Sequence, residues 1–359
     1  MKLFFVQGCK PAILALLLSA CASQVQEETS ASQPSGLRIC FYNVEQLYDI
    51  HDDPAIEEDA DYLPSGKKQW TDERYQAKLD KIVQVIAALN MPEVIGLAEI
   101  ENGQVLRDIV KHEKLSDYSY EIIHFDTPPP NSLDVALLYR SVFFTPYLAK
   151  AVNVPADSNG HRPPDILQVS GILGERSNME SNTIHLLITD WPDRQGGMSK
   201  SEEERLSAAH TLRQLVNDIL ANDEDANIVV MGTFNDEPDN KSFVFRLGAH
   251  GETQQLNTGD LYNPMYKLDQ ADKGSYYSRS SWKMLDQILI SQSLLDDRKG
   301  SADFVYRQGS AQVFDTEWLL QTKGNTQQQP YPTYEGFEYK GGYSDHLPVY
   351  IDLQSDSTN

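Results

Sequence analysis

The 359-residue chain has little basic charge: 30 Lys and Arg stand against 53 Asp and Glu, which gives a formal net charge of −23. Most non-specific affinity for nucleic acid comes from Lys and Arg beside the phosphates. We find no cluster of these residues in the sequence. The composition therefore disfavours nucleic acid as a ligand, although an acidic chain with a local basic groove remains compatible with it.

The chain also has few cysteines and no long apolar run. Its three cysteines are Cys9, Cys21 and Cys40. The stretch 12–18 is apolar, but a helix that spans a bilayer needs about 20 such residues. If the N-terminal segment is removed and Cys21 is modified, Cys40 has no disulfide partner within the chain. Cys40 lies in an apolar strand pattern, which predicts a small buried side chain.

The first residues have the order of a secretory signal. Two lysines and the apolar stretch 12–18 precede the small residues Ser19 and Ala20. The tetrad Leu18-Ser19-Ala20-Cys21 resembles a bacterial lipobox, which implies that Cys21 carries the lipid and becomes the mature N-terminus. An ordinary cleaved signal with a chance cysteine is the alternative. We predict a lipoprotein signal peptide over 1–20.

The location of the mature protein follows from this anchor. Several acyl chains on one cysteine give a durable attachment, which predicts an outer-membrane lipoprotein of the cell envelope. The pair Glu27-Glu28 resembles a surface-export signal of some Gram-negative lipoproteins, so both a periplasmic and a surface position stay open. Residues 21–36 combine the lipidated cysteine with a polar, aperiodic stretch, and we predict a flexible tether there.

Residues 37–355 are predicted to form one domain, because the sequence contains no internal repeat and no second composition regime. Branched, aromatic and alternating patterns predict strands at 37–44, 94–98, 120–125, 133–139, 166–173, 183–189, 228–232, 285–291 and 347–353. Helices are predicted after Thr71, over 104–111, and after a capping box formed by Ser201 and Glu204. This mixed order favours a layered α/β sandwich over a purely parallel doubly wound sheet.

Polar residues stand at the ends of several predicted strands. They are Asn43, Glu99, Asn235, Asp236, Asp286 and the pair Asp345-His346. Carboxylates, amides and a histidine gathered in this way suit a hard cation and an anionic substrate. Taken singly, each acid is more often a turn or cap residue, so the argument depends on their occurring together.

Seven segments resemble the endonuclease/exonuclease/phosphatase superfamily in order and spacing, over about residues 37–353. They are FYNVEQLYD (41–49), GLAEIEN (96–102), LDVALLYR (133–140), WPDRQGG (191–197), MGTFNDEP (231–238), LDQILIS (285–291) and GGYSDHLP (341–348). The runs SDHLP and MGTFNDEP are the most specific. The resemblance implies a DNase I-like, four-layered α/β sandwich of two packed mixed sheets flanked by helices.

The resemblance further implies Mg²⁺- or Mn²⁺-assisted attack of water on a phosphate ester. By matching motifs, Glu99 would be the main metal carboxylate, supported by Asn43 and Asp345. A phosphorylated small molecule or nucleic acid would be the substrate class.

The remaining matched positions would act on the phosphate. Asn235 would orient the phosphate or the water, and Asp286 would assist on the leaving-group side. His346 would contact the scissile phosphate, oriented by neighbouring carboxylates. Arg162 lies near the family's phosphate-binding arginine, with two prolines before Asp165 that the pattern does not have.

Two catalytic positions depart from the family. The pattern H-W-P-S-R is here D-W-P-D-R, with Asp190 in place of the histidine, and G-D-F-N is here G-T-F-N, with Thr233 in place of the aspartate. An Arg-Gly pair is replaced by Asn131-Ser132. An ionised Asp190 cannot donate to a phosphate oxygen, and a threonine hydroxyl is no base near neutral pH. Each lost acid or base typically contributes about 10²–10⁴ in rate.

Neighbouring residues offer poor replacements. His185 lies an odd number of residues before Asp190, which places the two on opposite faces of a strand. Asp236 is close to Thr233, but the family carries an acid there in addition to the lost one, so Asp236 would reach the metal only after a loop shift.

Three functions stay open. The first is a catalytically impaired member with a binding role, whose partner is a phosphorylated molecule, a protein or a glycan. The alternative is an active divalent-metal-dependent phosphoesterase with altered chemistry, acting on phosphomonoesters, phosphodiesters or nucleic acid. The third is an envelope scaffold without a site.

Overall fold

The computed structural model describes residues 36–128, 133–156, 162–174, 182–194, 201–295, 304–324 and 327–355. All of them belong to one compact unit. The predicted signal peptide, Cys21, the tether up to residue 35 and the pair Asn131-Ser132 lie outside these ranges. None of the helices within the described ranges is long and apolar enough to cross a membrane.

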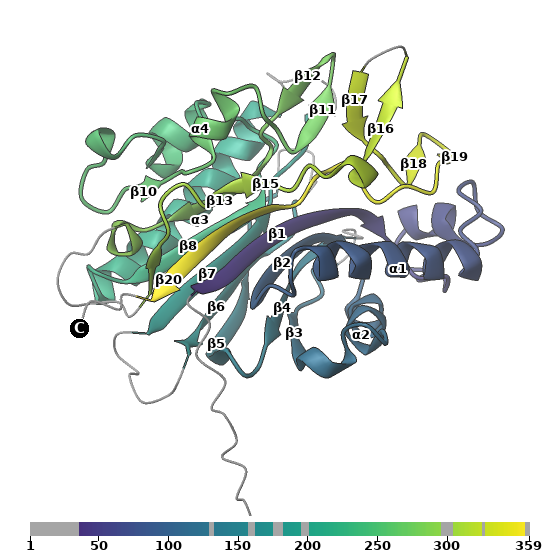
Figure 1. Cartoon of the computed structure of the whole chain (residues 1–359), viewed down its shortest axis with the longest axis horizontal. Coiled ribbons are helices and arrows are strands. Elements are labelled where there is room, and N and C mark those ends of the chain that lie inside the picture. Colours follow the sequence, from purple (N-terminus) through teal and green to yellow (C-terminus); the bar gives the residue numbers. More distant parts are fainter. Residues whose placement is uncertain are drawn as a thin grey trace, which may run out of the picture. The chain divides into compact units, whose positions relative to one another are not determined.

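The described strands form two seven-stranded sheets that pack face to face (Figure 1). The first sheet has the order β14 (Phe304–Tyr306), β20 (Val349–Ser355), β1 (Gly36–Leu47), β2 (Val94–Ile100), β4 (Asp134–Arg140) and β3 (Tyr120–His124), and β15 (Gln312–Val313) also pairs with β20. The second sheet has the order β5 (Phe144–Val152), β6 (Ile166–Leu173), β7 (Thr183–Asp190), β8 (Asn227–Thr233), β13 (Asp286–Ile290), β10 (Leu261–Tyr262) and β9 (Ala249–His250). Both sheets mix parallel and antiparallel pairs.

Helices cover the outer faces of both sheets. The α-helices are α1 (Asp72–Ala88), α2 (Gly103–Lys111), α3 (Glu202–Asn222) and α4 (Tyr266–Asp269). The apolar side of α1 belongs to the large core cluster, which contains residues of both sheets, whereas that of α3 belongs to a separate cluster on the second sheet. The predicted DNase I-like sandwich of two packed mixed sheets is confirmed.

Shorter elements complete the fold. Single helical turns are η1 (Glu58–Tyr62), η2 (Ser116–Tyr118), η5 (Thr253–Gln255), η6 (Gln292–Leu294) and η7 (Glu317–Leu319), and η4 (Ser242–Leu247) is a π-helical turn. Three hairpins stand apart from the sheets: β11 (Tyr276–Ser278) with β12 (Ser281–Lys283), β16 (Leu320–Lys323) with β17 (Gln327–Pro330), and β18 (Tyr334–Glu335) with β19 (Glu338–Tyr339).

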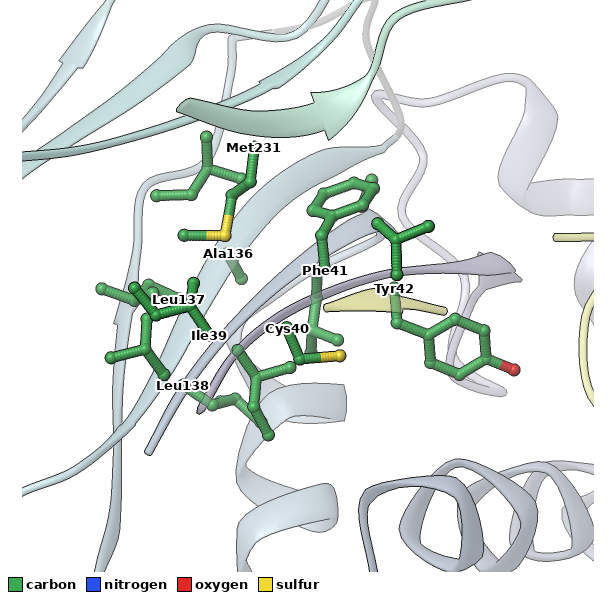
Figure 2. Packing of buried hydrophobic residues seen from close by; sticks show 14 of the residues in the cluster. Ile39, Cys40, Phe41, Tyr42, Ala136, Leu137, Leu138 and Met231 are labelled. Carbon is green, nitrogen blue, oxygen red and sulfur yellow. The ribbon is translucent and has the colours of Figure 1, made fainter. Parts of the chain in front are cut away.

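The interior between the sheets is close-packed around β1 (Figure 2). Phe41 from β1 and Met231 from β8 belong to one buried cluster. A Cβ on Gly96 of β2 would lie 2.7 Å from Met231 Sδ and 3.0 Å from the Phe41 ring, so glycine permits this close approach of the sheets. Cys40, the residue before Phe41 in β1, is fully buried as predicted, and burial raises the pKa of its thiol.

One sequence prediction is wrong, and one long strand was missed. Ser201 immediately precedes α3, but its hydroxyl accepts from Arg205 Nη1 at 2.7 Å and makes no capping hydrogen bond, so the capping-box prediction is wrong. Strand β5 was not predicted. It is an edge strand whose side chains are mostly exposed, and its composition therefore lacks the apolar alternation that marks a half-buried strand.

Candidate active site

The predicted site residues come from the inner strands of both sheets. Asn43 lies in β1 and Glu99 in the neighbouring β2. On the second sheet, Asp190 of β7 pairs in register with Thr233 of β8, and Thr233 pairs with Asp286 of β13. The two substituted positions are therefore direct neighbours on adjacent strands.

A chain of hydrogen bonds joins the two sheets at this point. Asn43 Nδ2 donates to Glu99 Oε1 at 2.8 Å and to Thr233 Oγ1 at 3.1 Å. The Thr233 hydroxyl donates to Asp286 Oδ1 at 2.6 Å. The other Asp286 oxygen lies 2.6 Å from His346 Nδ1. Apart from Glu99 these side chains are buried, so they form a fixed floor that leaves few polar atoms unpaired.

The backbone is irregular where this chain begins. Glu99 has a φ of 62° at a register shift in β2, and Glu45 and Gln46 have φ of 56° and 49° at a shift in β1. Asn43 and Glu99 thus lie at bulges within strands, not at strand ends as predicted. Non-glycine residues hold such angles at a cost of about 1–3 kcal/mol each. The local gain is a fixed Glu99, whose Oε2 accepts from Gln46 N at 2.8 Å.

Three half-buried carboxyl groups form an acidic rim above this floor: Glu99, Asp190 and Asp345. Burial, and next the charge of Asp345, raise the pKa of Glu99. Burial and the charge of Glu99 raise the pKa of Asp190 well above its ordinary value. Burial and the charge of Glu45 raise the pKa of Asp345 to about 6. Because the ionised rim carboxylates repel one another, a positive charge beside them stabilises their ionised forms.

His346, one of the floor residues, supplies part of this positive charge. Burial acts to lower its pKa, but Asp286, Asp345 and Glu99 outweigh this and raise the pKa to about 10. The imidazole is therefore a cation near neutral pH, held by Asp286 and packed against Tyr276 with ring centroids 4.7 Å apart. Tyr276 pairs with His346 through an isolated bridge, a contact that sequence reasoning did not predict.

Two carboxylates of the rim have the donor chemistry that a divalent cation requires, although the three rim groups do not bring ligand atoms within 4.8 Å of one another. Glu99 and Asp345 offer carboxylate oxygens, which are the ligands that Mg²⁺ and Mn²⁺ prefer, and they would hold the ion. When bound, the ion would neutralise phosphate charge and acidify a bound water. In this conformation Asn43 turns its nitrogen toward Glu99, while its Oδ1 accepts from Glu45 N at 3.0 Å. Asn43 therefore orients Glu99, and its predicted role as a ligand stays a prediction.

Asp236 is held by four side chains outside the floor and the rim. Its carboxylate contacts Arg205 Nε at 2.8 Å and Arg194 Nη2 at 3.1 Å, and it accepts from Asn240 and Ser242. It therefore holds the loop after β8 in place and is not free to replace the missing acid at position 233. The arginine contacts were not predicted, because nothing in the sequence links residue 205 to residue 236.

The other matched residues lie near the same edge. Asn235 follows β8 with a φ of 53°, and its Nδ2 donates to Trp191 O at 2.8 Å. Arg162 forms an ion pair with Asp165 at 2.5 Å, immediately before β6. Strand β6 runs antiparallel to β7, so this end of β6 lies at the end of β7 that carries Asp190. No hydrogen bond or ion pair joins Arg162 to the floor residues within the described parts of the chain.

His185 behaves as expected of an ordinary strand histidine. Its Nδ1 lies 2.8 Å from Ser170 Oγ, and burial lowers its pKa. It takes no part in the contacts around Asp190 described above, in agreement with the opposite-face prediction.

Comparison with known proteins identifies the family. Residues 38–355 match the model of the endonuclease/exonuclease/phosphatase family, and the chain belongs to this family. No curated protein matches the chain.

Solved structures agree on the fold. The chain is similar to humanised zebrafish (D. rerio) TDP2, with 14% identity and a TM-score of 0.53 over 89% of this chain and 100% of that one. A Bacteroides thetaiotaomicron mannosyl-6-phosphatase gives 15% identity and 0.53 over 88% and 99%. The human nocturnin catalytic domain with bound sulfate gives 16% and 0.51 over 89% and 95%. At such low identity these similarities establish the fold.

Proposed function

We propose that this protein is a cation- and phosphate-binding member of the family whose hydrolytic activity is strongly reduced. The observation that carries the proposal is the register pair Asp190–Thr233. Both substitutions fall on adjacent strands of the second sheet, while the chain of hydrogen bonds from Asn43 to His346 is complete.

Thr233 forms the hydrogen bonds that hold the floor together, but it cannot act as the catalytic base. Its hydroxyl accepts from Asn43 and donates to Asp286, so it connects the two sheets in the floor. Because an unperturbed hydroxyl does not take up a proton near neutral pH, this position cannot activate water as a carboxylate would. The geometry of the floor is thus kept and the base is lost.

Asp190 opposes an anion at the same edge. The family pattern has a histidine here, which can donate to a phosphate oxygen. A carboxylate has no donor when ionised and repels the phosphate. Burial and the charge of Glu99 raise the pKa of Asp190. A cation beside Glu99 would offset the second of these causes, so cation binding favours the ionised form. His346 remains as the cationic donor of the site.

Titration of the protein with inorganic phosphate, in the presence and absence of Mn²⁺, tests this proposal. We expect phosphate binding that depends on Mn²⁺, and no turnover of phosphomonoesters or phosphodiesters beyond a trace. His346→Gln should weaken phosphate binding at least about tenfold, the loss of a charged hydrogen bond, while Mn²⁺ still binds. Phosphate binding that is absent, or is equal with and without Mn²⁺, contradicts the proposal.

An active hydrolase with altered chemistry is the second candidate, favoured by the complete hydrogen-bonded floor. A screen should include sugar phosphates, since one structural relative is a mannosyl-6-phosphatase, and also phosphodiesters and nucleic acid. If turnover exists, His346→Ala should abolish it; unchanged turnover in that variant would remove this candidate. A scaffold without a site predicts instead that Glu99→Ala leaves cation binding unaltered.

The cellular place of the site depends on the N-terminus. We infer from the lipobox-like tetrad that Cys21 is lipidated and anchors the protein to the outer membrane, facing the periplasm or the surface. Metabolic labelling with a fatty acid should mark the wild type and leave Cys21→Ala unmarked. Accessibility to an added protease on intact cells distinguishes the two faces. Labelling that persists in Cys21→Ala contradicts the lipoprotein prediction.

A further inference from the structure

A second group of metal-ligating side chains lies outside the site described above, at the hairpin of β3 and β4. His124 ends β3, Asp134 begins β4, and Asp126 lies between them. Within the described residues, this is the one set of three His, Cys, Asp or Glu side chains whose ligand atoms all lie within 4.8 Å of one another.

Strand geometry explains why these residues meet. His124 pairs in register with Ala136, and Asp134 lies two residues before Ala136. Side chains two residues apart on a strand point to the same face, and diagonal neighbours across a pair are within reach of each other. His124 Nε2 consequently lies 3.6 Å from Asp134 Oδ2, and His124 Nδ1 lies 3.6 Å from Asp126 Oδ1.

The histidine is buried with an unused nitrogen. Its side chain is only 6% exposed, and its buried Nε2 has no hydrogen-bond partner. The 3.6 Å to Asp134 exceeds the length of a hydrogen bond. A buried polar atom without a partner is unfavourable, so this nitrogen, which faces the Asp134 carboxylate, points to a ligand between them.

The spacing suits a metal ion. Histidine nitrogens and carboxylate oxygens bind Zn²⁺ at about 2.0–2.2 Å, so two ligands on one ion lie roughly 3.0–3.6 Å apart. A single ion takes one nitrogen of a ring, so the spacing that applies is the 3.6 Å between His124 Nε2 and Asp134 Oδ2, which falls at the upper end of that range. Asp126 contacts the other ring nitrogen, Nδ1, and its side chain is 79% exposed, so it would complete the set by turning toward the ion on Nε2.

Asp134 is already positioned as a ligand. Its side chain is 7% exposed, and both oxygens accept from Thr127 N at 3.1 Å. Thr127 Oγ1 in turn accepts from Asp165 N at 3.2 Å. Backbone bonds of this kind fix the orientation of a carboxylate ligand. The exposed side of the cluster leaves room for water as further ligands.

We propose that His124, Asp126 and Asp134 form a second cation site, which takes Zn²⁺ or a similar transition metal in preference to Mg²⁺. One imidazole with two carboxylates suits such an ion, whereas Mg²⁺ prefers oxygen ligands alone. The site shares no residue with the Glu99–Asp345 rim, although Asp134 pairs in register with Ile100, next to Glu99. An ion there would tie the β3–β4 hairpin to the Thr127–Asp165 contact beside Arg162.

Calorimetric titration of the protein with Zn²⁺, in a large excess of Mg²⁺ that saturates the rim, tests the proposal. We expect one Zn²⁺ per chain. His124→Gln and Asp126→Asn should each weaken binding at least about tenfold, and since Asp126 is exposed, its variant should fold normally. His112→Gln is the matched control, because His112 contacts a single carboxylate, Asp80, at 2.9 Å. X-ray absorption should show a nitrogen ligand in the wild type that His124→Gln lacks.

The outcomes separate this site from the rim. If Zn²⁺ binding survives in both His124→Gln and Asp126→Asn, or the wild type binds no Zn²⁺, the second site does not exist. If Glu99→Gln instead abolishes Zn²⁺ binding, the ion occupies the rim, and the second site is refuted while the proposed function stands. Retained Zn²⁺ binding in Glu99→Gln supports two independent sites.

Discussion

The two sheets contribute unequally to the candidate active site. The first sheet and the loop before β20 supply Asn43, Glu99 and Asp345, all of which match the family pattern. The second sheet supplies the adjacent strands β7 and β8, whose facing residues Asp190 and Thr233 do not. Under the proposed function, cation binding and proton transfer belong to different halves of the sandwich, so that one would be lost while the other remains.

The two substituted residues of the second sheet also differ in how well their surroundings accommodate them. Thr233 is integrated into the floor by hydrogen bonds to Asn43 and Asp286, whereas burial and the charge of Glu99 disfavour the ionised form of Asp190 and raise its pKa. The surroundings accommodate the substitution at Thr233 through hydrogen bonds, but they disfavour the charged form of the residue at position 190. We therefore expect the second-sheet pair to control the rate, and the first-sheet residues to control affinity for the cation.

Restoring the family residues in the second sheet should have the largest effect. The double variant Asp190→His/Thr233→Asp supplies both missing proton-transfer groups. We expect its phosphoesterase rate with Mn²⁺ to exceed that of the wild type by at least about 10²–10⁴, the contribution of one such group. Since the two groups act together, each single reversion should recover much less.

The control for this experiment is Asp190→His/Thr233→Asp carrying Glu99→Gln in addition, which should be inactive. A double variant that binds Mn²⁺ and stays inert would contradict the proposal that two substituted catalytic groups limit the activity, and the comparison between the sheets would fail.

The pH dependence of cation binding should report on the first-sheet half. Because the pKa of Asp345 is raised to about 6, the carboxyl holds a proton at lower pH and must release it to bind an ion. Mn²⁺ affinity should therefore be nearly constant above about pH 7 and fall by up to about tenfold per pH unit below pH 6. Asp345→Asn should flatten this dependence; an unaltered profile in that variant would assign the proton to another group.

The raised pKa of Asp345 also makes the stability of the cation-free protein depend on pH. The folded pKa of Asp345 lies above the ordinary value of a free aspartate, so the folded state binds more protons between these values and its stability falls as pH rises through that window. His346, whose pKa is raised to about 10, acts in the same direction at higher pH. We expect the Tm of the wild type to fall between about pH 4 and pH 7 by more than that of Asp345→Asn, and added Mn²⁺ to reduce the difference.

Removing the Thr233 hydroxyl should have the smallest of these effects, and on stability alone. Thr233→Val leaves Asp286 Oδ1 and one Asn43 bond without their partner in a buried site, which costs about 1–3 kcal/mol. Thr189→Val is the matched control: Thr189 is equally buried in β7, and its Oγ1 makes no hydrogen bond. Urea unfolding of both variants gives the comparison. Equal losses would show that the Thr233 bonds do not hold the floor together.

The fold was largely predictable because its inner strands carry branched apolar residues that only a buried sheet explains. The edge strand β5 and the short hairpins were not, since their conformation is set by pairing partners distant in sequence. At the site, motifs identified Asn43, Glu99, Asp286 and His346, but not their order in the hydrogen-bonded chain. The bulges that position Glu99 require positive φ angles at residues that are not glycine, so the sequence did not indicate them.

Interactions formed by ordinary residues were also invisible in the sequence. Arg205 resembles any helix residue, yet it is buried against Asp236. His124 belongs to an unremarkable strand pattern, and only the hairpin register brings it to Asp134. Such pairs leave no local pattern, because each depends on a contact between distant segments.

The most direct test of the central claim is the location of Mn²⁺ by anomalous scattering in crystals of the protein, beside Glu99→Gln and the control Glu101→Gln. Glu101 is the next acid along the chain, and its Oε2 accepts from Asp49 N at 2.6 Å. The account predicts an anomalous peak between Glu99 and Asp345 in the wild type and in Glu101→Gln, and none there in Glu99→Gln. A wild-type crystal without a peak at this rim would contradict the claim that the first-sheet half of the site is intact.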